Sequence, residues 1–209
     1  KLDGEHGNRV RAAIEGVHPD IKILHFWDNS FRHFTNRVRP FREPKDCEGI
    51  RTRTLPSEFH GHIYHRLGFD PAAQNIKDFI AEIEISEFDG HDNPLTNIYH
   101  FNVHKYHRYI TLTGHISSVC GLYVNLTLYE GWPDDVREAV DAAALEATNI
   151  QRALAIEEDI EQLKKFDPAE NEIIHLTVAE WQKFIDAVTP IIDEQRTIIG
   201  DELIDLVLS

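Results

Sequence analysis

The stretch Phe88-Asp89-Gly90-His91-Asp92-Asn93-Pro94-Leu95-Thr96-Asn97 lies between two segments with helical periodicity. Its Gly, Pro, acidic and Asn residues predict a loop that leads into a helix start. Free backbone N–H groups at a helix start can meet an anionic ligand, and amide side chains can join them. We therefore expect Asn93 to contact a ligand, although an Asn directly before Pro94 is also a common helix cap.

Two arginines upstream have mainly apolar and aromatic neighbours. Arg32 follows Phe31 in the segment 27–34, and Arg53 ends the segment Gly49-Ile50-Arg51-Thr52-Arg53. A planar guanidinium binds a carboxylate in a bidentate manner. Two such groups converging with Asn93 would form a carboxylate clamp, so we expect a protein that binds a small organic acid without transforming it. The alternative is that each Arg forms an ordinary ion pair.

The composition narrows the class of partner. The chain has 209 residues, of which 42% are hydrophobic, enough for one large domain or two smaller lobes. A formal net charge of -15 argues against binding to nucleic acid or to an anionic membrane surface. The sequence contains no run of 18 apolar residues, so we expect no transmembrane helix and no membrane insertion. Methionine is absent, so we expect a processed or truncated chain.

Helical and strand-like segments alternate along the chain, which predicts an α/β fold with mainly parallel strand pairing. A polar loop is expected through Asn29 and Ser30. The expected helices cover residues 2–16, 56–68, 75–85 and 94–107, with a further helix through Trp181 that ends near Gly200 and a short helical tail after it. The expected strands cover 21–27, 49–54, 109–113, 119–126 and 172–176.

A long helix is predicted from Pro133 to Phe166. Pro and two acids mark its start, and no Gly or Pro interrupts it before Pro168. At 1.5 Å per residue its length is about 45–50 Å, too long for one small lobe. We expect it to lie across two lobes. Further on, Thr177 and Glu180 have the spacing of a capping box.

Histidines and cysteines raise a competing interpretation. His60, His62 and His65 cluster, as do His100, His104 and His107, and the pair His100/His104 has a spacing that can hold a metal. No acid or Cys falls at a standard zinc spacing nearby, so we expect no metal. Cys47 and Cys120 match no metal or redox motif, and their disulfide state stays open. No catalytic motif is present.

An ordered set of motifs, rather than any single one, resembles the extracytoplasmic solute-binding proteins of TRAP (tripartite ATP-independent periplasmic) transporters, of the dicarboxylate type. The motifs are Gly49-Ile50-Arg51-Thr52-Arg53, Leu67-Gly68-Phe69-Asp70-Pro71, Asp89 to Leu95, Tyr109 to His115, and Gln151-Arg152 on the long helix.

The resemblance implies a two-lobed, periplasmic-binding-protein-like fold with the long helix bracing both lobes. Family members are longer at the N-terminus, so the first lobe is expected to be incomplete. The expected division is residues 1–29 as the remainder of lobe I, 30–118 as lobe II, 119–157 as a lobe I strand with the long helix, and 158–209 as the C-terminal helices of lobe II.

The family's ligand-binding pattern falls on three residues here: Arg53 as the hallmark carboxylate partner, Arg32 as the second Arg, and Asn93. Trp27 and Asp28 are expected to line the cleft, although Trp27 could instead be a core residue. The chain departs from the pattern with His91 and Asp92 before the Asn, and it lacks the aromatic residue that some members carry just after the position of Pro71. The two departures leave open which group the ligand carries away from its carboxylate.

The resemblance also implies how the protein works. A monomeric periplasmic protein would capture a carboxylate, close by hinge motion, and dock on the membrane subunits of a TRAP transporter, with no cofactor and no catalysis. Sugar acids, C4-dicarboxylates, aromatic acids and keto acids would all satisfy one Arg clamp. Two alternatives remain: a metal-dependent enzyme that uses the His clusters, and a sensor-type domain that binds carboxylates.

Overall fold

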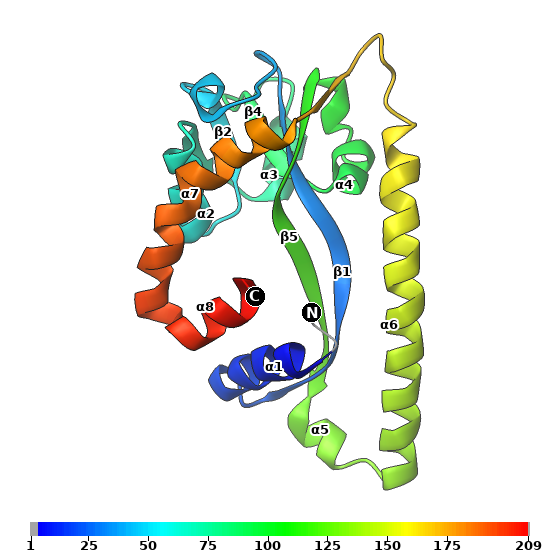
Figure 1. Ribbon diagram of the computed structural model, residues 1–209. Helices are drawn as coiled ribbons and strands as arrows, with labels where there is room; N and C mark the ends of the chain where they lie inside the picture. Colours follow the sequence, from blue (N-terminus) through cyan, green and yellow to red (C-terminus); the bar gives the residue numbers. More distant parts are fainter. Residues whose placement is uncertain (1–3, 209) are drawn as a thin grey trace. The chain divides into compact units, whose positions relative to one another are not determined.

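The computed structural model describes residues 4–208 (Figure 1). The predicted start of the first helix at Leu2 lies outside this range. The helices are α1 (Glu5–Val17), η1 (Pro44–Cys47), α2 (Glu58–Arg66), α3 (Ile76–Glu82), α4 (Leu95–His100), η2 (Val103–Lys105), α5 (Leu126–Glu130), α6 (Asp134–Leu163), α7 (Val178–Ile199) and α8 (Asp201–Leu208); the strands are β1 (Ile21–Asn36), β2 (Arg51–Thr54), β3 (Asp70–Ala73), β4 (Gly90–Asn93), β5 (Tyr109–Asn125) and β6 (Glu172–His175).

One mixed sheet carries the described strands in the order β3-β2-β4-β1-β5-β6. The pairs β2–β3, β2–β4 and β5–β6 are parallel, as expected for an α/β fold, whereas β1 and β4 pair antiparallel. The antiparallel pair sets Phe34 opposite Asp92, and the parallel pair sets Arg53 opposite His91. Segments far apart in the sequence therefore meet on neighbouring strands.

One predicted loop and one predicted break between strands are wrong. The polar stretch through Asn29 and Ser30 lies inside β1, and β5 runs without interruption where two strands were expected. Ser30 has a φ of 59°, and its N–H donates to Asp28 Oδ1 at 2.8 Å. A local bend of this kind lets polar residues lie within a long strand.

The largest error concerns residues 90–93, where the predicted loop is strand β4. All four residues of β4 are buried, and β1 and β2 pair with it on its two sides. Sheet pairing therefore overrides the turn preference of Gly90 and Asn93. Helix α4 is also shorter than predicted and ends at His100, with η2 after it.

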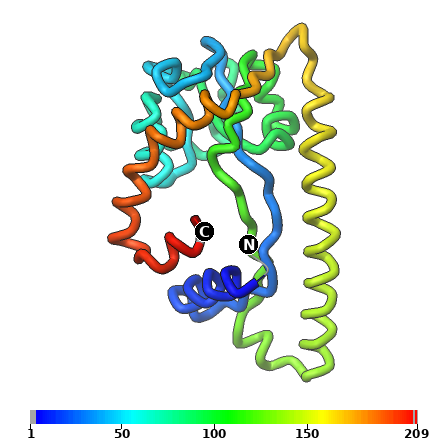
Figure 2. The backbone as a smooth tube through the Cα atoms, viewed as in Figure 1, coloured from blue at the N-terminus to red at the C-terminus, as the bar shows by residue number. Residues whose placement is uncertain are grey.

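The chain divides into two compact units. Unit 1 contains residues 1–30, 118–157 and 195–209, and unit 2 contains residues 31–117 and 158–194. The chain passes from one unit to the other within β1, β5, α6 and α7, and Figure 2 lets the reader follow these four passages along the backbone. Helix α6 has 30 residues and contributes to both units.

Unit 2 contains two hydrophobic clusters. The first gathers side chains of β1, η1, α2 and α7, including Phe34, Tyr64 and Phe184. The second gathers side chains of α3, α4 and β5, including Phe79 and Ile110. These clusters fix the strands that carry the candidate site, because buried apolar contacts are the main stabilising contribution in a protein core.

In unit 1, polar side chains of α6 hold the backbone of β1. Gln151 accepts from the N–H of Asp28 at 3.0 Å and donates to its carbonyl at 2.6 Å, and Arg152 donates to the carbonyl of Phe26. The expected long helix is confirmed by the 30 residues of α6. Its Gln151-Arg152 pair has a structural role, because both side chains bind the backbone of β1. Among residues 4–208, no helix combines the length and apolar character needed to cross a bilayer.

Both cysteines are free thiols. Cys47 is buried in η1, where burial raises its pKa well above the usual value, whereas Cys120 is exposed on β5. Cys47 belongs to unit 2 and Cys120 to unit 1. This resolves the question that the sequence left open, because no disulfide joins them.

Candidate functional site

Arg32 and Asp92 form a buried ion pair between β1 and β4. Arg32 Nε donates to Asp92 Oδ2, Nη2 donates to the Asp92 carbonyl at 2.6 Å, and Nη1 donates to Asn93 Oδ1 at 3.2 Å. The Arg32 side chain is only 9% exposed and that of Asp92 only 1%. Removing one partner would leave a buried charge without compensation, so each group needs the other.

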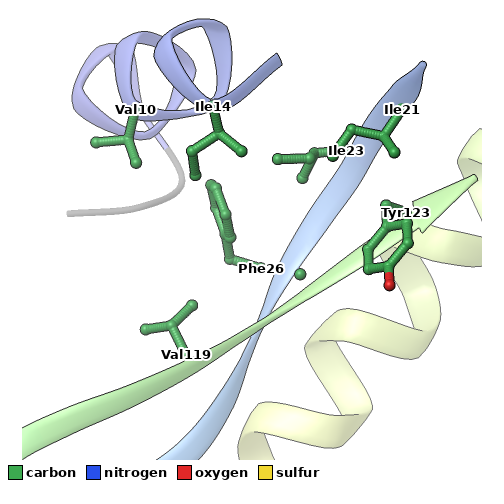
Figure 3. Close-up of a pocket in the computed structure, with 8 residues that line it drawn as sticks. Val10, Ile14, Ile21, Ile23, Phe26, Val119 and Tyr123 are labelled. Atoms are coloured by element: carbon green, nitrogen blue, oxygen red, sulfur yellow. The ribbon is translucent and has the colours of Figure 1, made fainter. Parts of the chain in front are cut away.

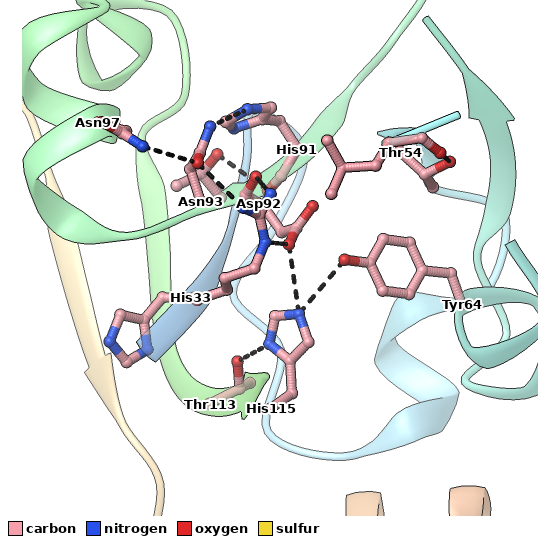
Figure 4. Close-up of polar contacts among 12 residues, drawn as sticks. His33, Thr54, Tyr64, His91, Asp92, Asn93, Asn97, Thr113 and His115 are labelled. Carbon is pink, nitrogen blue, oxygen red and sulfur yellow. Dashed lines mark hydrogen bonds and ion pairs between the residues drawn. The ribbon is translucent and has the colours of Figure 1, made fainter. Parts of the chain in front are cut away.

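His115 faces the same oxygen of the Asp92 carboxylate as Arg32 does. Its Nε2 is 3.5 Å from Asp92 Oδ2 and 3.4 Å from the Tyr64 hydroxyl, and its Nδ1 is 2.7 Å from Thr113 Oγ1 (Figure 4). The ring stacks on Phe34 with centroids 3.9 Å apart. These contacts fit a neutral ring that donates from Nε2 and accepts at Nδ1.

The protonation states follow from burial and from these contacts. Burial acts to raise the pKa of Asp92, but His115 and Arg32 outweigh it and hold the pKa well below its usual value. Burial lowers the pKa of His115 and raises that of Tyr64 well above the ordinary value. The cluster at neutral pH therefore contains an ionised Asp92, a charged Arg32, a neutral His115 and a protonated Tyr64.

Asn93 connects this cluster to the start of α4. Its Oδ1 accepts from Arg32 and also from Asn97 Nδ2 at 3.2 Å, and its Nδ2 lies 3.1 Å from His91 Nε2. Figure 4 shows Asn93 between Asn97 and His91. The predicted proximity of Arg32 and Asn93 is thus found, and contact of Asn93 with a ligand stays a prediction.

Arg53 differs from Arg32 in its hydrogen bonding. It is 1% exposed on β2, its Nε donates to the Gln74 carbonyl at 2.8 Å, and its Nη1 is buried without a hydrogen-bond partner. Burial lowers its pKa from the ordinary value, while the charge of Asp92 acts in the opposite direction. A buried guanidinium with a free donor is a ready partner for an anion.

Trp27 and Asp28, the other two predicted site residues, lie in the part of β1 that belongs to unit 1. Trp27 Nε1 donates to Thr148 Oγ1 at 3.0 Å, and the Asp28 carboxylate accepts from the N–H of Ser30. Both side chains thus have local structural partners, and their role in lining a cleft stays a prediction.

The pocket of unit 1 does not suit a carboxylate. It has a volume of about 380 Å³, and Figure 3 shows the side chains that surround it. No charged residue lines it. Its lining residues are Val10, Ile14, Ile21, Ile23, Phe26, Val119, Gly121 and Tyr123.

Two histidines of the second cluster, His104 and His107, have structural partners. His104 stacks on Tyr99 with centroids 4.6 Å apart, and buried His107 lies 2.8 Å from Thr35 Oγ1 through its Nδ1. Across residues 4–208, the structure contains no group of three or more His, Cys, Asp or Glu side chains arranged to hold a metal ion.

The sequence did not reveal the parts played by Asp92, His115 and Tyr64. Asp92 is 60 residues from Arg32, and His115 is 51 residues from Tyr64. No local pattern signals such pairs, since they depend on which strands become neighbours. The departure from the family pattern at Asp92 was the one available signal.

Comparison with known proteins places these features in a family. The family model described as bacterial extracellular solute-binding protein, family 7 (DctP), matches residues 1–197. The 2,3-diketo-L-gulonate-binding periplasmic protein YiaO of Escherichia coli is 26% identical over 187 residues, which cover 90% of this chain and 56% of that protein. The C4-dicarboxylate-binding periplasmic protein DctP of Rhodobacter capsulatus is 27% identical, with coverage of 96% and 60%. The chain thus spans little more than half the length of these relatives.

Solved structures agree on the fold. A TRAP periplasmic solute-binding protein from Ralstonia eutropha, with bound (S)-2-acetolactate, matches with a TM-score of 0.90 and 25% identity over 98% of this chain and 66% of that one. The sugar acid binding protein DctPAm of Advenella mimigardefordensis, in complex with galactonate, matches with a TM-score of 0.89 and 22% identity, with coverage of 99% and 66%. The expected α/β fold of TRAP solute-binding proteins is confirmed, and the chain belongs to the family 7 bacterial extracellular solute-binding proteins.

Proposed function

We propose that this protein binds a small organic acid through Arg53 and delivers it to a TRAP transporter. The observation that carries the proposal is the buried Arg53 guanidinium, whose Nη1 has no hydrogen-bond partner. Leaving a buried donor unsatisfied is costly, and a ligand carboxylate would satisfy it with a charge-assisted hydrogen bond. Arg32 and Asn93, which are hydrogen-bonded to each other, would complete the polar end of the ligand site.

The names of family members support the location that we propose for ligand binding. Relatives carry names that describe periplasmic binding of a sugar acid derivative or of C4-dicarboxylates. These names support our proposal that this protein captures its ligand in the periplasm. We further propose that it acts as a monomer and without catalysis. Release to the membrane subunits of the transporter would follow, and the protein itself would stay outside the bilayer.

The test is a thermal-shift and calorimetric screen of the 209-residue chain against small carboxylates. A ligand at a hundred times its dissociation constant adds about 2.7 kcal/mol to the free energy of unfolding and should raise the melting temperature by several degrees. Arg53→Lys keeps the charge but loses the planar fork, so affinity should fall by about tenfold or more.

Arg51→Ala is the matched control. Arg51 lies two positions away on the same strand, but it is part-exposed and pairs with Asp70 and Glu87. Its loss should leave ligand affinity unchanged. Unchanged affinity in the Arg53→Lys variant would contradict the proposal, as would a chain that no carboxylate stabilises. A melting temperature that falls with chelator would instead favour the metal-dependent alternative.

A further inference from the structure

Three buried charges lie on the neighbouring strands β1, β2 and β4 of unit 2: those of Arg32, Arg53 and Asp92. Burial lowers the pKa of His91 and of His107, so these buried histidines are neutral at pH 7 and add no charge. The buried side of the site therefore carries two positive charges and one negative charge.

Asp92 already neutralises Arg32. Each of the three guanidinium nitrogens of Arg32 donates a hydrogen bond, two of them to Asp92 and one to Asn93. By contrast, no carboxylate among the described residues forms an ion pair with Arg53, and its Nη1 stays without a partner. Unit 2 thus offers one buried positive charge that a ligand can neutralise.

The Asp92 carboxylate also has one oxygen to spare. Its Oδ2 accepts from Arg32 and faces His115, whereas its Oδ1 is buried with no hydrogen-bond partner. An ionised carboxylate can only accept hydrogen bonds. A hydroxyl group can donate to it, while a second ligand carboxylate cannot and would be repelled by its charge.

We propose that the ligand is a hydroxylated monocarboxylate, whose carboxylate pairs with Arg53 and one of whose hydroxyl groups donates to Asp92 Oδ1. This inference rests on the proposed function and names its substrate class. Arg53 and Asp92 lie one register position apart on the neighbouring strands β2 and β4, and the charge of Asp92 acts on the pKa of Arg53. Side chains from successive positions of β4 already meet at this end of the strand, because Arg32 donates to both Asp92 and Asn93. Dicarboxylates and acids without hydroxyl groups would each leave one of these two requirements unmet.

The test compares ligands that differ at one carbon atom. Calorimetric dissociation constants are measured for glycerate and tartronate, for gluconate and glucarate, and for galactonate and galactarate. Within each pair a terminal CH₂OH is replaced by a carboxylate. In the pairs that bind, the monoanion should bind at least about tenfold more tightly. Hexanoate, which has the chain length of gluconate without its hydroxyl groups, should bind more weakly than the hydroxylated acids.

Asp92→Asn supplies a second, independent measurement. It removes the charge that compensates Arg32 and lets the side chain donate hydrogen bonds, so the preference for monoanions over dianions should fall by about tenfold. Asp70→Asn is the control, since it breaks the exposed Arg51–Asp70 pair on a strand next to Arg53. It should leave the preference unchanged. Circular dichroism checks that each variant is folded. If Asp92→Asn does not fold, the comparison of the ligand pairs on the unsubstituted chain still tests the substrate class.

The outcomes separate this inference from the proposed function. A dianion that binds as tightly as its monoanion partner, or hexanoate that binds as tightly as gluconate, overturns the substrate class while leaving carboxylate binding intact. A chain that binds none of these acids and no other carboxylate overturns both. The proposal is supported if the hydroxylated monoanions bind more tightly than the dianions and hexanoate, and if the preference for monoanions falls in Asp92→Asn but not in Asp70→Asn.

Discussion

At the scale of single residues, His107 shows how burial links stability to pH. It is fully buried, its Nδ1 lies 2.8 Å from Thr35 Oγ1, and its Nε2 has no hydrogen-bond partner. Burial, followed by the nearby charge of Arg37, lowers its pKa from 6.5 to about 3. Between pH 6.5 and about 3 the ring is therefore neutral in the folded protein, whereas it is protonated in the unfolded chain.

We expect the free energy of unfolding to fall as the pH falls from 7 to 5. The pKa is lower in the folded state, so the unfolded state binds the proton first and gains stability below pH 6.5, until the pH reaches about 3. One such His contributes about 2 kcal/mol between pH 7 and 5. Asp92 adds nothing in this window, because its pKa lies far below it.

Urea unfolding at several pH values measures this slope. His107→Asn, which can retain the contact with Thr35, should reduce the slope by one proton. Equal slopes in the natural chain and in His107→Asn would contradict the assignment.

The residue scale also shows what sequence reasoning can reach in the site. It singled out Arg32, Arg53 and Asn93 chiefly through the resemblance to a known family, because residue type and spacing alone fit an ordinary ion pair or a helix cap equally well. It assigned both arginines to the ligand and did not foresee that Arg32 is already paired within the protein. The difference between them comes from Asp92, whose pairing depends on strand order, a property that local patterns do not encode.

At the scale of elements, Gly90 fixes how closely β4 and β2 can approach. A Cβ built at Gly90 would lie 2.6 Å from Thr52 Oγ1 and 3.1 Å from Ile50 Cγ2. Both neighbours are buried and have little room to move. Gly90→Ala should therefore lower the free energy of unfolding by about 1–3 kcal/mol, as overpacking does in a dense core.

Gly61 in α2 provides the comparison. A Cβ there meets nothing within 4 Å, so Gly61→Ala should instead raise the free energy of unfolding by about 0.5–1 kcal/mol through helix propensity. Chemical denaturation of the two variants measures both effects. A neutral Gly90→Ala would show that β2 and β4 are not held this closely.

The element scale explains which parts of the fold were predictable. The start of α6, the helix periodicity of α7 and the Thr177–Glu180 capping box are local signals, and all three are confirmed. Strand β4 was missed because its four residues are held by two neighbours rather than by their own propensity. Sequence periodicity also failed to predict which side chains of α6 are buried. Leu154 is 57% exposed although it is apolar, whereas the polar Thr148 is only 1% exposed.

At the scale of the whole molecule, the two units differ in how much apolar surface they bury. Both hydrophobic clusters lie in unit 2. In unit 1, large apolar side chains of α6 and β5 stay exposed, among them Ile150 at 54%, Ile156 at 63% and Tyr123 at 63%. Few buried apolar contacts mean a low free energy of local opening.

Hydrogen exchange should therefore be faster in unit 1 than in unit 2. We expect amides of α1, α8 and the unit 1 part of α6 to exchange well before those of β2, β4 and α3, when followed by mass spectrometry at neutral pH. Uniform protection across both units would contradict this expectation. It would mean that unit 1 gains stability from contacts other than apolar burial.

The two free thiols give the natural chain a practical property. Cys120 is accessible on β5, whereas Cys47 is buried with a raised pKa, and only a thiolate reacts readily with maleimides. A fluorophore therefore attaches to one defined position without any engineering. Since β5 continues from unit 1 into unit 2, a dye at Cys120 would report the ligand binding that we propose, and its fluorescence could be followed on single molecules.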